Sequence, residues 1–361
     1  NYLEKQFRDS KKIFRDIKEL TRNGDYTLGN KVNEVEKKFQ KITDCKYAIG
    51  VGSGTDAILL SLKALGVGQG DEVITPSYTF YATVGAIVQS GAKPVFIDIK
   101  DDYNLDEDQI EKYITNKTKA IVPVHWAGLI CNMKKIYKIA KKFNLFIVED
   151  ACHAINASRE GYKAGRYSNA ACFSLHPLKN INVWGDGGFV VTNSTKMYKK
   201  LILSRNHGLV NRDTCKIFAG NSRLDTIQAI VADNLLSKLK LITNTRIKNS
   251  LYFDRRLSEI KEIKIPIRYK KAKQVFHIYV IKTVNRNRLQ KYLISNGIDA
   301  KIHYPIPMHL QPAAQKYGYK LGDFPIAENL SKTIISLPVH EFITKKDVKF
   351  IAEKIKDFYL K

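Results

Sequence analysis

The sequence predicts an α/β protein with a large domain, built on a mostly parallel sheet between helices, and a smaller C-terminal α/β domain. The first observation is that short β-type runs alternate with helical patterns between residues 46 and 192, which is typical of a parallel sheet covered on both faces. The second is that a similar alternation resumes after about residue 260. The third is the length of 361 residues, which allows one large core and a second domain.

The elements follow in order along the chain. An N-terminal arm, residues 1–30, is predicted to be helical, with breaks at 23–25 and at Gly29. In the large domain, residues 31–245, we expect strands at 47–51, 72–76, 94–99, 120–125, 145–150, 171–176 and 188–192, and helices at 55–65, 81–89, 105–114, 133–143 and 224–242. In the C-terminal domain, residues 246–361, we expect strands at 277–283 and 301–306 and helices at 286–297 and 345–359.

The formal charge of +25, from 60 Lys and Arg against 35 Asp and Glu, is the unusual bulk property. Such a charge favours nucleic acid, an acidic membrane surface or a phosphorylated substrate. The lysines are spread along predicted helix faces, however, with no basic tail and no Arg-rich block. We therefore expect neither a nucleic-acid partner nor a membrane partner.

The five cysteines are scattered, odd in number and without a CxxC pair. This pattern indicates neither a metal site nor a disulfide framework, and it fits a reducing compartment. The first twelve residues are charged and amphipathic, without the apolar core of a signal peptide. We expect a cytoplasmic protein.

One lysine, Lys179, lies between the apolar runs 173–176 and 188–192, and a glycine-rich turn, 185–188, precedes the second run. A lysine on a short loop against a sheet edge is partly desolvated, which lowers its pKa and makes the amine a nucleophile. The alternative is an ordinary solvated loop lysine. Neighbouring residues have to decide between the two.

Parallel strands end at a common edge of the sheet, so residues just past their ends converge there. The turn at 50–58 leads into a helix, where the N–H groups of Gly54 and Thr55 are predicted to hold a phosphate. A dinucleotide fingerprint is the competing interpretation, but the later glycine of that motif is missing. After the next strand, Phe80 or a neighbouring tyrosine offers a flat ring for stacking, with core packing as the alternative.

The strand 145–150 ends in Asp150, and a carboxylate there must be paired or must face a site. Against a pyridine nitrogen it would keep that nitrogen protonated, as pyridoxal phosphate chemistry requires. His153 is placed to reach the phenolic oxygen of the cofactor, and Ser174 its phosphate. A phosphate cradle, an aromatic ring, an aspartate and a lysine together predict a pyridoxal phosphate site.

Several segments also resemble one known family. They are VGSGTDAILLSLKALGVGQGDEVITPSYTFYATVGAI, VEDACHA, FSLHPLKN with the later GDGG, GNSRLDTIQA and HYPIPMH, and they are similar to the sugar-nucleotide aminotransferases of the DegT/DnrJ/StrS group. The resemblance implies the aspartate-aminotransferase-like fold, type I among pyridoxal phosphate enzymes. It also implies a homodimer whose active sites are shared between subunits.

By position, the resemblance implies that Lys179 is the Schiff-base lysine and that Asp150 is the partner of the ring nitrogen. It implies that Phe80 stacks on the ring and that His153 lies on its O3′ side. The other implied contacts are to the phosphate, from Gly54, Thr55 and Ser174 and from Asn221 of the partner subunit, and to the sugar, from His309. Tyr304 and the bulky Trp184 are further candidates for the sugar pocket.

The chain departs from the family at 153–156, where His-Ala-Ile-Asn replaces the Gln-Ala-His-Gly of many members. The retained Lys179 disfavours the family variant that has histidine there and dehydrates a keto sugar. KN followed by GDGG resembles members that act at C-3 of the sugar, while the EDACHA segment occurs among C-4 enzymes. We favour C-3 and keep C-4 as the alternative.

The expected reaction transfers an amino group from L-glutamate, which leaves as 2-oxoglutarate, to the keto group of a nucleotide-diphosphate sugar, for surface polysaccharide such as lipopolysaccharide O-antigen. Two alternatives from other classes stay open. One is an NAD(P)-dependent sugar-nucleotide reductase built on the glycine-rich turn. The other is a regulator that binds nucleic acid through its positive surface.

Overall fold

The structure is a computed structural model, and it describes residues 2–360. Its N-terminal part comprises α1 (Leu3–Gln6), α2 (Lys11–Asn23) and α3 (Asn30–Thr43). Gly24 ends α2 in the left-handed conformation, with φ at 68°, which glycine adopts without strain. The predicted breaks at 23–25 and before residue 30 are confirmed.

The central sheet has seven strands in the order β1-β8-β7-β5-β4-β2-β3. Their bounds are β1 Tyr47–Val51, β2 Glu72–Pro76, β3 Lys93–Ile97, β4 Thr118–Ile121, β5 Phe146–Asp150, β7 Ala170–Ser174 and β8 Gly188–Thr192. Strand β8 is antiparallel to both of its neighbours, and the other pairings are parallel. The predicted α/β class with a mostly parallel sheet is confirmed.

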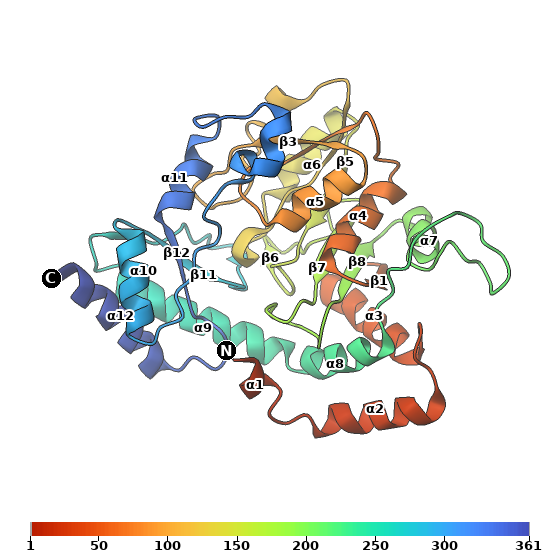
Figure 1. Ribbon diagram of the computed structural model, residues 1–361, viewed down its shortest axis with the longest axis horizontal. Helices are drawn as coiled ribbons and strands as arrows, with labels where there is room; N and C mark the ends of the chain where they lie inside the picture. The colour runs from red at the N-terminus through yellow and green to blue at the C-terminus, as the bar shows by residue number, and fades with distance from the viewer. Residues whose placement is uncertain (1, 361) are drawn as a thin grey trace.

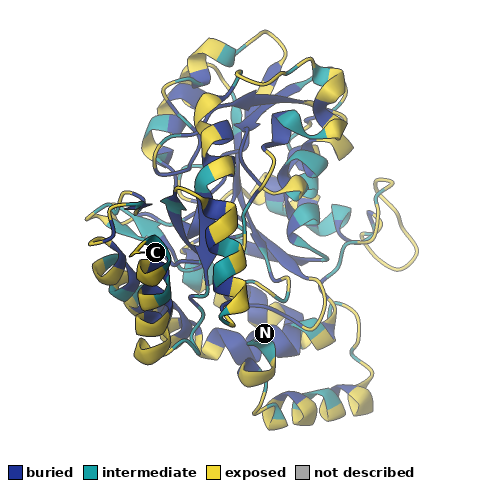
Figure 2. Ribbon diagram, turned by 60° about the vertical axis from the view of Figure 1, so that its left-hand side comes forward, coloured by how far each residue is buried: buried dark blue, intermediate teal, exposed yellow. Residues whose placement is uncertain are grey.

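Helices cover both faces of this sheet (Figure 1). One apolar cluster holds side chains of α4 (Gly54–Ala64), α5 (Tyr81–Gln89) and α7 (Thr195–Ser204). The cluster on the other face holds side chains of α2, α3, α6 (Met133–Lys142) and α8 (Thr226–Ser237). Figure 2 shows the strands buried and the outward faces of the helices exposed, as expected for strands that carry continuous apolar runs.

The C-terminal part follows α9 (Leu239–Leu257), which comes directly after α8. Its antiparallel sheet has the order β12-β11-β9, and it has its own apolar cluster. The bounds are β9 Ile263–Lys264, β11 Tyr279–Thr283, α10 Arg286–Ser295, α11 Pro325–Thr333, β12 Ile334–Leu337 and α12 Lys345–Leu360. A two-stranded pairing of β6 (Ser158–Arg159) with β10 (Ala272–Lys273) joins the two parts. The predicted domain boundary at 245/246 falls inside α9 and stays a prediction.

Two predicted elements are wrong. The helix expected at 105–114 is a single 3₁₀ turn, η1 (Ile110–Tyr113), because the Asp102 and Asp106 side chains accept from backbone N–H groups two residues on and compete with a helix. The strand expected at 301–306 forms one bridge, from Lys301 to Ser336. The Tyr78 hydroxyl accepts from the N–H of Tyr304 (2.5 Å) and lies within hydrogen-bond distance of its carbonyl (3.0 Å), so these groups need no sheet neighbour.

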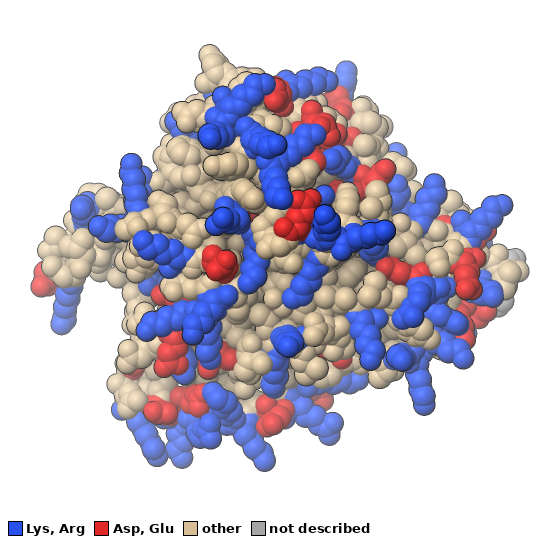
Figure 3. All heavy atoms as spheres, turned by 180° about the vertical axis from the view of Figure 1, so that it is seen from behind, with Lys and Arg blue, Asp and Glu red and all other residues tan. Residues whose placement is uncertain are grey.

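The charged side chains on the face drawn in Figure 3 are mixed. Lys and Arg are scattered over it with Asp and Glu between them, rather than gathered in one track. Within residues 2–360, the structure contains no helix with the length and apolar content that spanning a membrane requires.

Candidate active site

A cavity of about 230 Å³ lies where β5 and β7 end and α4 begins. Parallel strands β5 and β7 are neighbours, so their last residues, Asp150 and Ser174, reach the same edge. The predicted residues that line this cavity are Gly54, Thr55, Phe80, Asp150, His153, Ser174, Lys179 and Tyr304. The structure thus brings together eight side chains or backbones from five separate segments of the sequence.

Lys179 lies on the irregular segment between β7 and β8. Its N–H donates to the carbonyl of His176 at 2.8 Å, and its own carbonyl accepts from Asn182 Nδ2 at 3.2 Å. Burial lowers the pKa of Lys179, and the thiol of Cys152 and the carboxylate of Asp150 oppose that shift. The direction agrees with the sequence prediction, and it favours the neutral, nucleophilic amine.

Asp150 is 6% exposed at the end of β5. Its Oδ1 accepts from the N–H of Cys152 (3.1 Å) and its Oδ2 from the hydroxyl of Thr83 (2.7 Å). Among the described residues no Lys, Arg or His nitrogen lies within 4.0 Å of this carboxylate. A buried carboxylate is costly without a positive partner, so this site suits a ligand that presents a protonated ring nitrogen.

One end of the cavity is the first turn of α4. Ser53 caps the helix by accepting from the N–H of Asp56 at 3.0 Å. Across residues 2–360 nothing accepts from the N–H groups of Gly54 and Thr55, which therefore remain available to an anion. A Cβ at Gly54 would lie 2.7 Å from Ser174 Cβ and 2.9 Å from Cys152 Sγ, so only glycine allows this close approach.

Two histidines stack on one wall. The rings of His153 and His277 have centroids 4.1 Å apart and an interplanar angle of 29°. Burial lowers the pKa of both well below the ordinary value, so both are neutral. The Nδ1 atom of His153 is buried without a partner in the described chain. Phe80, which also lines the cavity, is 48% exposed, with its ring centroid 5.9 Å from that of Tyr304.

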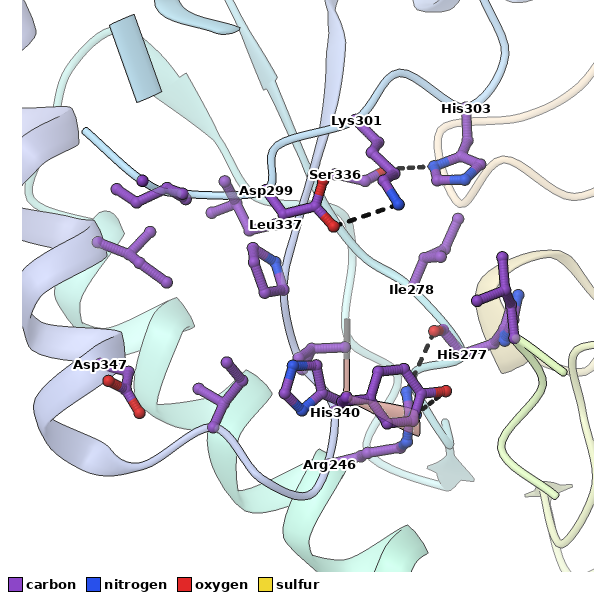
Figure 4. Close-up of a pocket in the computed structure, with 18 of the residues that line it drawn as sticks. Arg246, His277, Ile278, Asp299, Lys301, His303, Ser336, Leu337, His340 and Asp347 are labelled. Atoms are coloured by element: carbon purple, nitrogen blue, oxygen red, sulfur yellow. Dashed lines mark hydrogen bonds and ion pairs between the residues drawn. The ribbon is translucent and has the colours of Figure 1, made fainter. Parts of the chain in front are cut away.

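A second cavity, of about 590 Å³, adjoins the first, and both are lined by Leu178, His277 and His303. Figure 4 shows Arg246, Lys301 and His340 around this second cavity. Lys301 pairs with Asp299 at 3.2 Å, and His303 Nδ1 lies 2.9 Å from the hydroxyl of Ser336. Because the first cavity is small, the second offers the adjoining space for a reactant.

Three predicted residues are not brought to the first cavity. Trp184 packs its ring against Phe7 and Phe14 of the N-terminal arm, with centroid separations of 5.5 and 5.6 Å. His309 is 1% exposed and is held by Glu328 at 3.0 Å. Asn221 is exposed and forms a backbone bridge with Asn206, so any role at a shared site would need a second subunit.

The structure adds Thr83, His277 and His303, to which the sequence analysis gave no role. Thr83 comes one turn into the helix after a strand end, and His303 belongs to the quoted HYPIPMH segment, so both had a positional signal. His277 precedes β11 in the C-terminal part. Nothing in its local sequence indicates that it stacks on a residue more than 120 positions away.

These features fit pyridoxal phosphate. The free N–H groups of α4 and Ser174 match its phosphate, the unpaired Asp150 carboxylate matches its ring nitrogen, and the orphan Nδ1 of His153 is available to its oxygen. Lys179, whose pKa burial lowers, would offer an amine to its aldehyde.

Comparisons with known proteins also indicate a pyridoxal phosphate enzyme. A family profile described as the DegT/DnrJ/EryC1/StrS aminotransferase family matches residues 8–356. The chain is 38% identical to a "Pleiotropic regulatory protein" of Geobacillus stearothermophilus, over 99% of this chain and 97% of the relative. It is 36% identical to the dTDP-3-amino-3,6-dideoxy-alpha-D-galactopyranose transaminase of Aneurinibacillus thermoaerophilus, over 96% and 95%.

Among solved structures, S. venezuelae DesV in complex with a ketimine intermediate matches with a TM-score of 0.96 at 32% identity. The match covers 99% of this chain and 96% of DesV, so both parts of the chain follow the same arrangement as in that enzyme. The chain therefore belongs to the DegT/DnrJ/EryC1/StrS aminotransferase family and is a pyridoxal-phosphate-dependent aminotransferase.

Proposed function

We propose that this enzyme transfers the amino group of L-glutamate to the keto group at C-3 of a nucleotide-diphosphate-linked deoxy sugar and releases 2-oxoglutarate. The observation that supports it best is the presence in one cavity of Lys179, whose pKa burial lowers, and Asp150, a buried carboxylate with no Lys, Arg or His nitrogen of the described residues within 4.0 Å. This is the arrangement that amino-group transfer requires.

The residues that hold the cofactor come from four segments. We assign the phosphate to the N–H groups of Gly54 and Thr55 and to Ser174, the ring face to Phe80, and the O3′ side to His153. Bound pyridoxal phosphate supplies the electron sink and stores the amino group between the two half-reactions. Asp150 keeps the proton on the ring nitrogen, and Thr83 and the Cys152 N–H orient its two oxygens.

Lys179 moves the reacting protons. Its amine, whose pKa burial lowers, removes the α-proton of glutamate and later delivers a proton to the sugar carbon that carried the keto oxygen. The neutral His153 and His277 and the ring of Tyr304, 8% exposed, limit water around that amine.

The position on the sugar rests on sequence features and on a relative. The transaminase of A. thermoaerophilus is named for an amino group at C-3, and C-4 stays the alternative. The test is an assay with glutamate and a panel of dTDP-, UDP- and GDP-linked 3-keto and 4-keto sugars, with products identified by NMR. A 3-amino product supports the proposal, whereas a 4-amino product replaces the C-3 assignment and the absence of any amino sugar contradicts the function.

We also propose a homodimer with shared sites. The loop between α7 and α8 projects from the body (Figure 1), and its residue Phe218 is 103% exposed. Asn221 at the base of this loop is the residue assigned to the partner's phosphate. In a mixture of Lys179→Ala and Asn221→Ala chains, hybrid dimers would regain one intact site; a monomer by light scattering would contradict shared sites.

The setting of the reaction is inferred from its chemistry. We place it in the cytoplasm, in the supply of an amino sugar for a surface polysaccharide such as lipopolysaccharide O-antigen.

One relative is named a pleiotropic regulatory protein, so binding of this chain to nucleic acid should be measured. A regulator would bind DNA with a steep salt dependence, and we expect no such binding because the lysines are spread along the chain without a basic tail or an Arg-rich block.

A further inference from the structure

A chain of buried polar side chains runs from the backbone of Lys179 to the N-terminal arm and on to the C-terminal part. Asn182 Nδ2 donates to the carbonyl of Lys179 (3.2 Å) and to Gln6 Oε1 (2.8 Å). Gln6 Nε2 donates to Glu341 Oε1 (2.9 Å), and Glu341 Oε2 lies 3.4 Å from Arg246 Nη2. We call these four residues, Gln6, Asn182, Arg246 and Glu341, the Gln6 network.

The chemistry of the partners fixes the orientation of both amides. A carbonyl and a carboxylate only accept, so the NH₂ of Asn182 must face Lys179 and Gln6, and the NH₂ of Gln6 must face Glu341. The exposed fractions are 6% for Gln6, 0% for Asn182 and 2% for Arg246. Water cannot replace a lost partner at such depth, so each contact holds the next in place.

The segment that carries Lys179, residues 175–187, contains no helix or strand. Side-chain contacts therefore have to fix it, and the N-terminal arm supplies several of them. Besides the bond from Asn182 to Gln6, Trp184 packs against the rings of Phe7 and Phe14. The arm thus contacts this segment on both its polar and its apolar side chains.

The network also reaches the cofactor wall. Arg246 Nη1 donates to the carbonyl of His277 at 3.3 Å, and the ring of His277 stacks on that of His153. Figure 4 shows Arg246 and His277 on the same wall of the second cavity. One set of contacts therefore connects the nucleophile, the C-terminal part and the histidine wall.

We propose that Gln6 is a positioning residue for Lys179: the N-terminal arm holds the segment 175–187 through Asn182 and ties it to the C-terminal part through Glu341 and Arg246. This role rests on the function proposed above for Lys179. In this proposal α1 helps to position an active-site residue, although α1 itself does not line the first cavity.

The test compares Gln6→Met with Leu289→Ala. Met keeps the size of Gln6 and removes its hydrogen bonds, whereas Leu289, 0% exposed, belongs to the apolar cluster of the C-terminal part, which contains no residue of 175–187. In the apoprotein we expect Gln6→Met to speed hydrogen exchange of peptides covering 175–187 by roughly tenfold, and we expect Leu289→Ala to leave those peptides unchanged while lowering the melting temperature. Equal exchange in the two variants would overturn the proposal, whatever the cofactor does.

With pyridoxal phosphate bound, we expect Gln6→Met to lower kcat by roughly tenfold with little change in KM and to shift the pH at which the cofactor absorbance changes. Gln6→Glu, which keeps the acceptor for Asn182 but faces Glu341 with a second carboxylate, gives a second comparison if the Met variant does not fold. The proposed function has a separate test, which is to treat the wild-type protein with borohydride and look for pyridoxal phosphate fixed onto Lys179. Failure to fix it there would contradict the proposed function but would leave the exchange result standing.

Discussion

Asp150 and Lys179 face the same cavity, but the chain fixes them in different ways. Asp150 ends β5, where it pairs with Cys172 of β7 on one side and bridges Val124 on the other. Lys179 belongs to a segment without regular structure, and its carbonyl is held by the side chain of Asn182. The sheet therefore positions the proposed partner of the ring nitrogen, whereas the proposed nucleophile depends on Asn182, whose side chain is in turn bound by the distant Gln6.

The largest effect on activity is expected when the amine of Lys179 is removed. Lys179→Ala is expected to lower kcat by at least about 10⁴-fold, because the same amine forms the covalent link and transfers the protons. Amino-sugar formation followed by NMR measures this, with circular dichroism to show an unchanged fold. Turnover within tenfold of wild type would contradict the assignment.

Asp150→Asn tests the sheet-held partner without changing its size. We expect kcat to fall by about 10²–10³-fold, since a neutral amide no longer holds the proton on the ring nitrogen. The melting temperature should stay close to that of wild type, because the amide oxygen can accept from the Cys152 N–H and the amide NH₂ can donate to the Thr83 hydroxyl, which can then donate to Thr79. A near-wild-type rate would remove Asp150 from this role.

Ser174→Ala, at the last residue of β7, tests the proposed contact with the cofactor phosphate. Losing one charge-assisted hydrogen bond is expected to weaken cofactor binding by about 1.5–3 kcal/mol. Equilibrium dialysis or fluorescence titration of the apoprotein measures this, and unchanged affinity would count against the contact. Ser61→Ala, at a buried serine outside the cavity, is the control.

Thr83→Val removes the hydroxyl that donates to Asp150 Oδ2 at 2.7 Å and keeps the shape of the side chain. We expect kcat to fall by roughly tenfold, because the carboxylate loses one of the two bonds that orient it. Thr75→Val is the matched control, since Thr75 is equally buried but donates to the carbonyl of Val122. Equal rates in the two variants would mean that β5 alone orients Asp150.

The smallest expected effect is on the stability of the apoprotein. Burial lowers the pKa of Lys179 in the folded state, so between that pKa and the unfolded value of about 10.4 the unfolded chain binds more protons and stability rises with pH. Lys179→Met should therefore melt at a higher temperature than wild type at pH 7, with the gap closing toward pH 10.4. A difference in melting temperature that does not change with pH would contradict a lowered pKa of Lys179 in the folded protein.

Features set by local pattern were predictable from the sequence. The strand ending at Asp150, the glycine turn into α4 and the loop carrying Lys179 were all placed correctly, because strand ends and helix starts have local signals. The strand expected at 301–306 was wrong, since the hydroxyl of Tyr78, over 200 residues away, binds that backbone. The contact of Asn182 with Gln6 has no local signal either, because it joins residues 176 positions apart.

The antiparallel strand in an otherwise parallel sheet has a consequence for the nucleophile. A parallel neighbour of β7 would send the intervening chain to the opposite rim of the sheet before it returned. Because β8 runs the other way, with Ser174 opposite Gly188, the thirteen residues from 175 to 187 start and finish at one rim. Lys179 thus lies on a segment that begins and ends at the rim that carries Asp150.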